Sequence, residues 1–437
     1  MKSVKISTCK TALNGSLTFP GDKSLSHRAI IFGALAEGRS HFTNVLSGED
    51  CVCTRKAFEA MGVRVESSKD GAEIWIEGAG LHGLKAPRAE LYLGNSGTSM
   101  RLLMGLLAGQ KFSATLTGDP SLSSRPMRRV ADPLRKMGAK IEGKENGNFA
   151  PITVTGSGLV GREHVLSVAS AQVKSALLLA GLYADGVTGV AEPVRSRDHT
   201  ERFLKYFGAE LKEKGLTASL RGGQRLKAKS FEIAGDISSA AFFMALAALV
   251  PCAKISFRDV LWNPTRRGIA DVLQRAGIPF TGIKLSETHG PEITSDFSIS
   301  ACPFKAFEIK KEELPSLIDE IPVLCVLATQ AEGESVIHDA DELRVKESDR
   351  IESIKALLSP MGADIRSKGN SIHIKGPTKL TGAAVDSKKD HRIAMSGVVA
   401  GLIAEGVTEV RDIDCIDTSF PGFFGLLDKL KVPYEFV

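Results

Sequence analysis

Six copies of one pattern run along the chain, and this repetition limits the possible folds more than any other feature. Each copy opens with a helix of small and apolar residues that leads into a short strand, and this landmark recurs as GALAEGRSHF, GLLAGQKFSATL, GLYADGVTGV, LAALVPCAKISF, VLATQAEGESVI and GLIAEGVTEV. A second helix and strand follow each landmark, as FEAMGVRVE, LRKMGAKIE, LKYFGAEL, LQRAGIPF, LSPMGADI and LDKLKVPYEFV. Glycine after an apolar helix favours a left-handed C-cap, and the β-branched alternation beyond it favours a strand. Each copy is therefore predicted to fold as helix, strand, helix, strand.

Repeats of this kind must pack against one another, because a single copy cannot bury its own apolar face. Six copies could build an open solenoid or two closed groups of three. The terminal copies carry no polar capping face, so we expect an α/β (α+β) protein with two domains of three repeats each. The domain boundary is predicted near Gly235, and the leading segment VKISTCKTALNGSLTFPG is predicted as an extra pair of strands without a repeat of its own.

Composition and charge argue against several classes of protein. The 56 Lys and Arg against 51 Asp and Glu give a net charge of only +5, and aromatic residues make up 6%, so nucleic acid binding is not indicated. The N-terminus has no apolar signal region and no long uncharged apolar run follows, which predicts a cytoplasmic protein without a membrane segment. The seven cysteines are scattered except for Cys51 and Cys53, whose spacing is not that of a zinc site, so we expect reduced thiols and no metal.

Cationic side chains recur near the starts of the repeat helices. They are Lys23, Arg28, Arg101, Lys174, Lys346, Arg350 and Arg392. Cations gathered in apolar sequence repel one another, so each group needs an anion, either the protein's own or a ligand's. For Lys346 and Arg350, four apart on one helical face, the alternative is a surface helix whose cations pair with neighbouring carboxylates.

Two segments favour an anionic ligand. In GDKSLSHRA, the hydroxyl of Ser24 or Ser26 and the free backbone N–H groups of a helix start lie beside Lys23. In LGNSGTSMRLL, a Gly-rich loop runs into a helix, although a simple turn would have the same composition. The chain has no Walker A loop and no GxGxxG that links a strand to a helix, so nucleotide binding is not supported.

Two further residues are candidates for chemistry. Arg125 precedes a proline, which favours an extended backbone and a side chain free to meet a ligand, whereas Arg128 and Arg129 are typical of an exposed helix start. Asp319 stands beside Glu320 at the start of a strongly apolar segment, where a carboxylate is either used or caps the helix. No GxSxG or HExxH occurs, so neither covalent nor metal catalysis is supported.

Taken together, the motifs resemble one family closely, the 5-enolpyruvylshikimate-3-phosphate (EPSP) synthases. The resemblance covers nearly the whole chain and rests on GDKSLSHRA, GNSGTSMRLL, SSRPM, ASAQVKSALLLAGL, SRDHTERFL, DEIPVL, RVKESDRI, DHRIAMS and SFPGFF. It implies two domains of three βαβαββ repeats each, residues 21–235 and residues 1–20 plus 236–437, with crossovers near Gly21 and Gly235.

The resemblance also implies two binding sites. Shikimate 3-phosphate would contact Lys23, Ser24, Arg28, Ser170, Ala171, Ser196, Arg197, Asp319 and Lys346. Phosphoenolpyruvate would contact Lys23, Asn95, Gly97, Thr98, Arg125, Gln172, Arg350 and Arg392. Two substrates with two phosphates and two carboxylates would explain the gathered cations, since arginine binds such groups through paired, charge-assisted hydrogen bonds.

The reaction implied is the transfer of the enolpyruvyl group to the substrate 5-hydroxyl, a step of aromatic amino acid and chorismate biosynthesis that needs no cofactor. A general acid, a general base and cations beside the leaving phosphate are required. The resemblance offers Asp319, Glu347, Lys346 and Lys23; we assign Asp319 to the 5-hydroxyl and Glu347 to C3 as a hypothesis. Substrate binding is expected to close the two domains around the site.

The chain departs from familiar members of the family at several positions. Ala171 stands where many members have serine, Leu102 stands where many have proline, and His199 stands near a common tyrosine. Glyphosate inhibits the family, and Gly97 leaves room for it, so sensitivity to glyphosate is predicted. We also expect the protein to be a monomer.

Three other functions stay open at this point. A UDP-N-acetylglucosamine enolpyruvyl transferase would carry a cysteine within residues 119–124, which hold DPSLSS. An RNA 3'-phosphate cyclase relative would need a nucleotidyl-accepting histidine and a stronger basic surface. A non-catalytic protein would bind shikimate 3-phosphate without releasing phosphate.

Overall fold

The computed structural model describes residues 2–287 and 290–437. Two compact units divide the chain. One consists of Met1–Pro20, Ala234–Glu287 and Ile293–Val437, and the other of Gly21–Ile233 and Thr288–Glu292. Each unit contains three four-stranded sheets and is described by itself.

The unit Gly21–Ile233 holds three repeats of helix and sheet. The first consists of α1 (Lys23–Leu35), β3 (Glu37–Thr43), α2 (Glu49–Ala60), β4 (Arg64–Ser67), β5 (Ile74–Ala79) and the distant β14 (Ser230–Glu232). The second consists of β6 (Leu91–Tyr92), α3 (Gly97–Ala108), β7 (Ser113–Thr117), α4 (Pro120–Ser123), α5 (Arg128–Lys136), β8 (Lys140–Gly143), α6 (Lys144–Gly147) and β9 (Phe149–Thr155). The third consists of β10 (Glu163–Val165), α7 (Ala171–Gly181), β11 (Val187–Ala191), α8 (His199–Tyr206), β12 (Leu211–Lys214) and β13 (Thr217–Arg221).

The other unit repeats the same plan. Its first repeat consists of β2 (Asn14–Leu17), α9 (Ile237–Leu249), β15 (Lys254–Leu261), α10 (Gly268–Arg275), β16 (Phe280–Glu287) and β17 (Ile293–Ser300). Its second consists of β18 (Glu308–Ile309), α11 (Leu314–Leu317), α12 (Ile321–Ala328), β19 (Gly333–Ile337), α13 (Arg350–Leu358), β20 (Asp364–Lys368) and β21 (Ser371–Gly376). Its third consists of β22 (Ala384–Asp386), α14 (His391–Ile403), β23 (Val407–Arg411), α15 (Phe423–Lys429), β24 (Tyr434–Phe436) and β1 (Ser3–Ser7). Short 3-10 turns are Lys311–Glu313, Asp341–Val345, Ser359–Met361 and Ile413–Thr418.

All six sheets share one pairing pattern, a parallel edge strand followed by two antiparallel pairs. In the sheet of β7, for example, β6 pairs parallel with β7, β7 pairs antiparallel with β9, and β9 pairs antiparallel with β8. The register sets Ala114 opposite Val154 and Leu116 opposite Ile152, so the buried side chains share one face. The βαβαββ repeat and the predicted fold class are confirmed.

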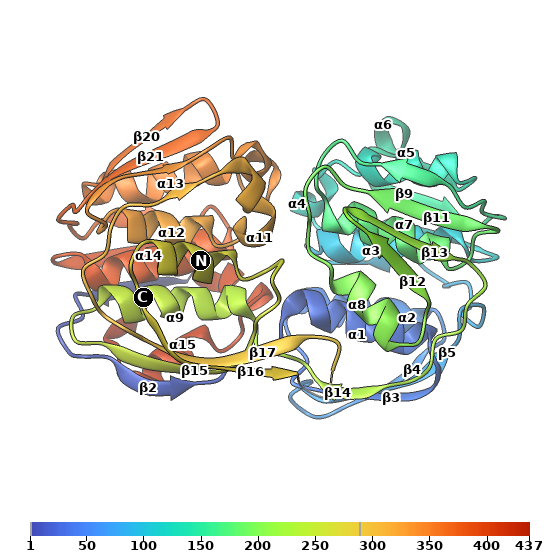
Figure 1. Cartoon of the computed structure of the whole chain (residues 1–437), viewed down its shortest axis with the longest axis horizontal. Helices are drawn as coiled ribbons and strands as arrows, with labels where there is room; N and C mark the ends of the chain where they lie inside the picture. Colours follow the sequence, from blue (N-terminus) through green and yellow to red (C-terminus); the bar gives the residue numbers. More distant parts are fainter. Residues whose placement is uncertain (1, 288–289) are drawn as a thin grey trace. The chain divides into compact units, whose positions relative to one another are not determined.

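The first helix of each repeat forms the core of its unit. In α9, for example, all residues from Ile237 to Ala248 are buried, and α9, α12 and α14 contact one another. Figure 1 shows these three helices inside their unit with strands on the outside. Such helices have no polar face because neighbouring repeats cover them on every side, as the small-residue landmarks predict.

The predicted left-handed turns after the second helices are confirmed. Five are glycines with positive φ, namely Gly62, Gly138, Gly208, Gly277 and Gly362. The last repeat has Lys431 at φ 57° in the same place. A non-glycine residue adopts positive φ at a cost in free energy, so this turn requires the left-handed conformation even where the repeat has no glycine.

The leading segment forms two strands, as predicted, and they do not pair with each other. Strand β2 pairs parallel with β15, whereas β1 lies between β23 and β24. Each strand thus completes the sheet of a different repeat.

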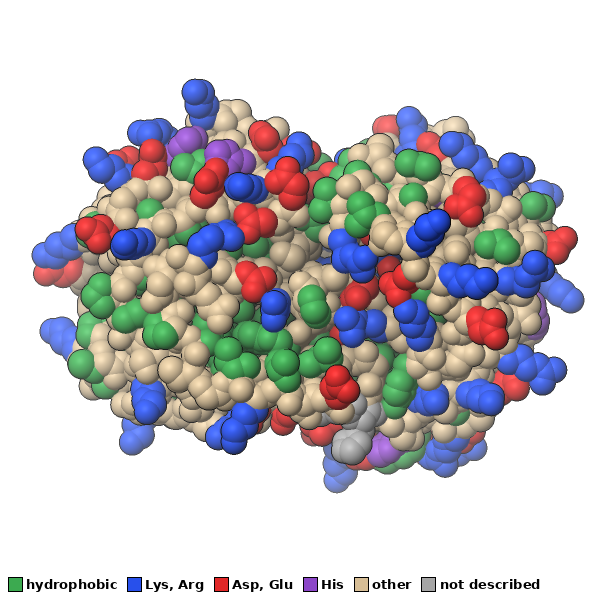
Figure 2. Space-filling view, viewed as in Figure 1, with side chains coloured by type: hydrophobic (Ala, Val, Ile, Leu, Met, Phe, Trp, Pro, Cys, Tyr) green, Lys and Arg blue, Asp and Glu red, His purple; other side chains and the backbone are tan. Residues whose placement is uncertain are grey.

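None of the helices in the described residues is long and apolar enough to cross a membrane. The seven cysteines form no disulfide, and four of them, Cys9, Cys51, Cys53 and Cys325, are buried, so most lie in the core as predicted. On the face shown in Figure 2, Lys and Arg side chains are interspersed with Asp and Glu.

Candidate active site

The N-terminus of α1 presents Lys23 and Ser24 beside a buried arginine. Asp22 caps the helix by accepting the Leu25 backbone N–H at 2.9 Å, and Lys23 Nζ lies 3.3 Å from Asp50 Oδ2. Ser24 uses its carbonyl oxygen to accept from Arg28 at 2.9 Å. Of the two serines predicted for an anion pocket, Ser26 is excluded, because it is buried and its hydroxyl accepts the Leu46 N–H.

Arg28 is held by hydroxyl groups from two other helices. Its Nε donates to Thr200 Oγ1 at 2.8 Å and a terminal nitrogen donates to Ser175 Oγ at 2.9 Å. Burial lowers the pKa of Arg28 to about 10, while Glu201 and Asp22 act in the opposite direction. The guanidinium stays charged at neutral pH, and among the described residues it makes hydrogen bonds to hydroxyl and carbonyl oxygens but to no carboxylate, so it suits an anionic ligand.

The loop before α3 brings Asn95 and Arg125 together. Asn95 Oδ1 accepts from Arg125, and its amide nitrogen donates to Asp119 Oδ2 at 2.7 Å. Ser96 caps α3 by accepting the Ser99 N–H at 3.1 Å. The predicted departure of Arg125 from a helix is borne out, since it lies between α4 and α5.

Gly97 stands at the start of α3, in a ring of polar side chains. Gln172 on α7 accepts from Arg101 at 2.7 Å and donates to Thr98 at 2.9 Å. A Cβ on Gly97 would lie 2.7 Å from an Arg101 nitrogen and 3.3 Å from one of Arg125. Two guanidinium groups therefore flank a backbone with no side chain, an arrangement suited to a small dianion.

The N-terminus of α7 and the loop before α8 carry the remaining predicted contacts of this unit. Ser170 caps α7 with its hydroxyl 3.4 Å from the Val173 nitrogen, and Ala171 is the first helical residue. Ser196 is buried and bonded to Glu192, whereas Arg197 is partly exposed.

In the other unit, Arg350 is the centre of a buried ion network. It is the first residue of α13, its side chain is 0% exposed, and its nitrogens lie 2.9 Å from Asp390, 2.5 Å from Glu347 and 3.3 Å from Asp319. Burial acts to lower the pKa of Arg350, but the three carboxylates outweigh it and raise the pKa. In turn, although burial opposes it, Arg350 holds the pKa of Asp390 below its usual value. The alternative of a solvated surface helix is wrong here, and Lys346 precedes the helix instead of sharing its face.

Asp319 lies among three cations. Its Oδ1 is 3.3 Å from Arg350, and 3.9 Å from both Lys346 and Arg392. Arg392 also donates to the Asp319 carbonyl oxygen at 2.9 Å. The N-cap position of α12 is Glu320, which makes no capping bond, so the alternative that Asp319 caps the helix is wrong. A partly exposed carboxylate among cations can exchange protons with a bound ligand.

Within the described residues, one group of three side chains has the geometry for a metal ion: Asp198, His199 and Glu292. His199 Nδ1 lies 2.6 Å from Glu292, and Arg202 lies 3.0 Å from Asp198 and 3.7 Å from Glu292. The arginine already compensates the carboxylates, so the donor set does not fit a metal site better than an ion network.

Comparisons with known proteins agree with these arrangements. A family model, EPSP synthase (3-phosphoshikimate 1-carboxyvinyltransferase), matches residues 8–427. The chain belongs to the EPSP synthase family. Proteins named 3-phosphoshikimate 1-carboxyvinyltransferase from Bacillus cereus (strain B4264) and Shouchella clausii (strain KSM-K16) are each 46% identical, covering 98% of this chain and 100% and 98% of their own lengths. Two solved structures of EPSP synthase from Acinetobacter baumannii match with TM-scores of 0.90 and 0.88 at 44% and 43% identity, over 100% and 99% of both chains.

Within this EPSP synthase family member, the residues expected to bind substrates fall into one group per unit. The first group is Lys23, Ser24, Arg28, Asn95, Gly97, Thr98, Arg125, Ser170, Ala171, Gln172, Ser196 and Arg197, and the second is Asp319, Lys346, Glu347, Arg350 and Arg392.

Three residues that bond to members of these groups were not predicted from the sequence: Glu192, Thr200 and Asp390. Asp390 stands two residues before Arg392 at a helix start, a capping signal that could have marked it. Thr200 carries no local signal, because its partners Arg28 and Ser175 come from other helices. Glu192 bonds Ser196 four residues further along the chain, but its other partner, Lys174, comes from α7.

Proposed function

We propose that this member of the EPSP synthase family transfers the enolpyruvyl group of phosphoenolpyruvate to the 5-hydroxyl of shikimate 3-phosphate and releases phosphate. The observation that carries the proposal is the family match over residues 8–427 together with full-length relatives of that name. We further propose that the two compact units are the two domains of the family, with crossovers near Gly21 and Gly235.

For shikimate 3-phosphate, the proposed contacts on the first unit gather at the N-termini of α1 and α7. Free backbone N–H groups and hydroxyls there supply donors, and Lys23 and Arg28 supply charge. Arg197 and Ser196 would reach the phosphate from the loop before α8. Asp319 and Lys346 would contact the same substrate from the other unit.

For phosphoenolpyruvate, the proposed contacts surround Gly97. Arg125 donates to Asn95, and Gln172 bonds both Thr98 and Arg101, so these side chains hold one another in place around Gly97. Such preorganisation favours tight anion binding. Lys23 is proposed to reach both substrates.

Arg392 and Arg350 are the proposed contacts from the second unit. Arg392 has no carboxylate within 3.5 Å among the described ion pairs and is suited to meet a ligand directly. Arg350 is fully paired, so it would bind phosphoenolpyruvate only by releasing one of its carboxylates.

The proposed chemistry is an addition followed by an elimination. The substrate 5-hydroxyl adds through oxygen to C2 of phosphoenolpyruvate while a proton is delivered to C3, and the tetrahedral intermediate then expels phosphate and loses a C3 proton. Asp319 is proposed to take the proton of the 5-hydroxyl, and Glu347 is proposed to carry out the proton transfers at C3. Lys346 is a further candidate for these proton transfers, and Lys23 is proposed to stabilise the charge on the departing phosphate. The monomeric state, the cytoplasmic location and inhibition by glyphosate stay predictions.

The test is phosphate release by the purified protein with phosphoenolpyruvate and shikimate 3-phosphate in metal-free buffer, with UDP-N-acetylglucosamine as a parallel acceptor. Release with shikimate 3-phosphate alone is the expected result. Release with UDP-N-acetylglucosamine, or binding of shikimate 3-phosphate without release, would overturn the proposal in favour of the sister transferase or a non-catalytic protein.

A further inference from the structure

A buried lysine on α7 lies between two buried glutamates. Lys174 Nζ is 2.6 Å from Glu192 Oε2 and 2.7 Å from Glu201 Oε1, and all three side chains are 3–4% exposed. Burial acts to lower the pKa of Lys174, but the carboxylates of Glu201 and Glu192 outweigh it and raise the pKa. Lys174 is therefore paired with two of the protein's own carboxylates and is buried away from solvent.

The two glutamates differ in what else they hold. Glu192 Oε2 also accepts the backbone N–H of Ser196 at 3.3 Å, and Glu192 Oε1 accepts the Ser196 hydroxyl. Glu201 Oε2 is buried without a hydrogen-bond partner among the described residues. Both donors of Ser196 are thus bound by a single carboxylate, and that carboxylate is held by Lys174.

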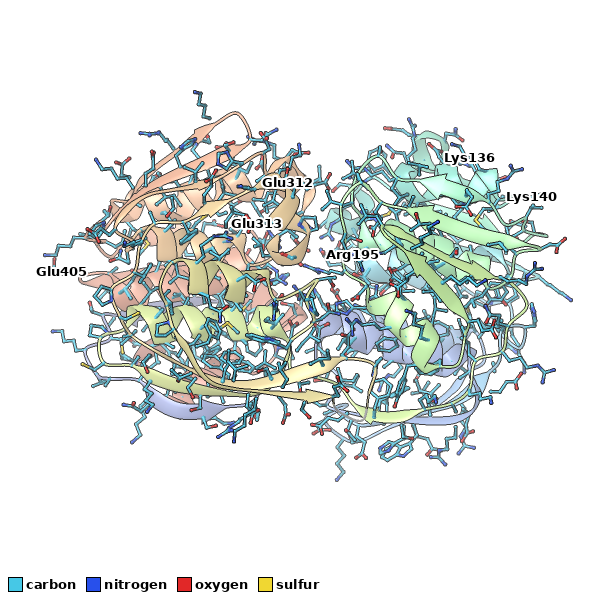
Figure 3. The ribbon with its side chains drawn as sticks, viewed as in Figure 1. Lys136, Lys140, Arg195, Glu312, Glu313 and Glu405 are labelled. Atoms are coloured by element: carbon cyan, nitrogen blue, oxygen red, sulfur yellow. The ribbon has the colours of Figure 1, made fainter. Side chains whose placement is uncertain are left out.

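Ser196 lies in a loop that is held by polar contacts of Ser196 and of the residue before it. Beside it, Arg195, labelled in Figure 3, donates to the carbonyl oxygen of Gly215 at 2.8 Å. The loop follows β11, and α8 begins at His199. The position of Ser196 therefore depends on Glu192 on its buried side and on Arg195 on its outer side.

Arg28, a second predicted contact of shikimate 3-phosphate, is held by the residues next to Lys174 and Glu201. Ser175 follows Lys174, and Thr200 precedes Glu201. The two hydroxyls lie 2.7 Å apart, and both accept from Arg28. Residues of α7 and α8 thus hold Arg28 through the hydroxyls of Ser175 and Thr200, and Lys174 on α7 holds Glu192, which bonds Ser196.

We propose that Glu192, held in place by Lys174, is a positioning residue that fixes Ser196 for the phosphate group of shikimate 3-phosphate. The inference rests on the proposed function. A hydroxyl hydrogen can rotate from the carboxylate to an arriving phosphate while its oxygen stays where it is. Removal of the carboxylate would release both donors of Ser196 and let the loop move, which weakens the binding of shikimate 3-phosphate and leaves phosphoenolpyruvate binding unchanged.

The test compares Glu192→Met with Glu201→Met. Methionine keeps roughly the length of the side chain and removes every acceptor, and each variant leaves Lys174 one carboxylate. We expect Glu192→Met to raise KM for shikimate 3-phosphate about tenfold, the size of a lost hydrogen bond to a charged group, with kcat and KM for phosphoenolpyruvate changed less than about twofold. Glu201→Met is the matched control and should leave both KM values within about twofold, whatever it does to the melting temperature.

A double-mutant cycle with Ser196→Ala separates positioning from a general loss of structure. If Glu192 acts through Ser196, the two changes in KM for shikimate 3-phosphate should not multiply. If Glu192→Met does not fold, Glu192→Gln is measured in its place, with a rise in the same KM expected, since an amide has one accepting oxygen in place of two.

Three results would overturn the inference. They are an unchanged or lower KM for shikimate 3-phosphate in a folded Glu192 variant, an equal rise in both KM values, and an equal effect of Glu201→Met. Failure of the proposed function would be seen separately, as absence of turnover in the unchanged protein.

Discussion

Gly97 shows how one missing methyl group can leave room between two guanidinium groups. A Cβ at this position would approach an Arg101 nitrogen to 2.7 Å, closer than real contacts allow, and Arg101 is bonded to Gln172. The guanidinium end would have to shift and carry Gln172 with it. The glycine is required here for the space beside the cations, because its φ is not among the positive ones.

Gly97→Ala is therefore expected to raise KM for phosphoenolpyruvate and the inhibition constant of glyphosate by about tenfold or more, as one methyl group in a close-fitting site can. The measurement is inhibition by glyphosate at several phosphoenolpyruvate concentrations. Gly158→Ala is the control, since a Cβ there meets no atom within 4 Å. Unchanged glyphosate inhibition in Gly97→Ala would contradict the steric argument.

Asp319 is the second residue whose role can be isolated. Asp319→Asn keeps the size of the side chain and leaves in place the hydrogen bond from Arg392 to the backbone carbonyl oxygen of residue 319. It removes the carboxylate that would accept the proton. We expect kcat to fall by a factor of about 10²–10⁴, typical of a lost general base, with the dissociation constant of shikimate 3-phosphate nearly unchanged. Steady-state kinetics and calorimetry measure the two quantities, and Glu352→Gln, at an exposed carboxylate on α13, is the control. Full turnover in Asp319→Asn would rule out the assignment.

At the scale of elements, three helices of one unit meet in a chain of buried hydroxyls and one imidazole. His27 on α1 lies 2.8 Å from Thr54 on α2, Thr54 lies 2.5 Å from Ser99 on α3, and Ser99 donates to Ser96 at 2.7 Å. Burial, Lys23 and Arg28 lower the pKa of His27 to about 3. The imidazole therefore stays neutral in the folded state and links the start of α1 to the loop of Gly97.

This shift makes stability depend on pH in a defined direction. Below about pH 6.5 the unfolded chain binds a proton at His27 and the folded protein does not, so stability falls as the pH is lowered from about 6.5 to 3. The contribution is about 1.4 kcal/mol per pH unit. His27→Gln should therefore show a shallower loss of urea midpoint over this range, whereas His82→Gln, at an exposed position, should follow the unchanged protein. If the urea midpoint changes equally with pH in all three proteins, the pKa of His27 is not lowered in the folded state, which would contradict this prediction.

At the scale of the whole molecule, the charged groups are divided between two compact units. Each unit has its own core of repeat helices and its own group of predicted substrate contacts. Under the proposed function, shikimate 3-phosphate contacts both groups, so its binding is expected to draw the units together and to exclude water from the reacting groups.

Shikimate 3-phosphate is accordingly expected to reduce the radius of gyration measured by small-angle X-ray scattering. Inorganic phosphate at the same concentration is the control, because it can satisfy one cationic group without joining two. Scattering profiles that are identical with and without shikimate 3-phosphate would contradict closure.

The sequence by itself determined the six repeats, their strands and helices, the left-handed turns and the places where cations begin a helix. These features depend on residues close together in the chain: apolar spacing, glycine conformation and helix capping act over a few positions. Lys23, Gly97 and Arg125 could be chosen for the same reason, since each stands at a recognisable helix start or before a proline.

Only the tertiary structure decided which strands complete which sheet and which charges meet. Strand β14 joins the sheet of β3, and β1 and β2 join different repeats, because hydrogen bonding of a sheet edge is open to any strand that the fold brings there. The sequence could mark Arg350 and Lys174 as cations but could not tell a ligand's anion from the protein's own. A buried charge is compensated by whatever group packs against it. Glu347 lies only three residues from Arg350, but the other carboxylates of Arg350 and both carboxylates of Lys174 come from other segments, and no local pattern encodes their approach.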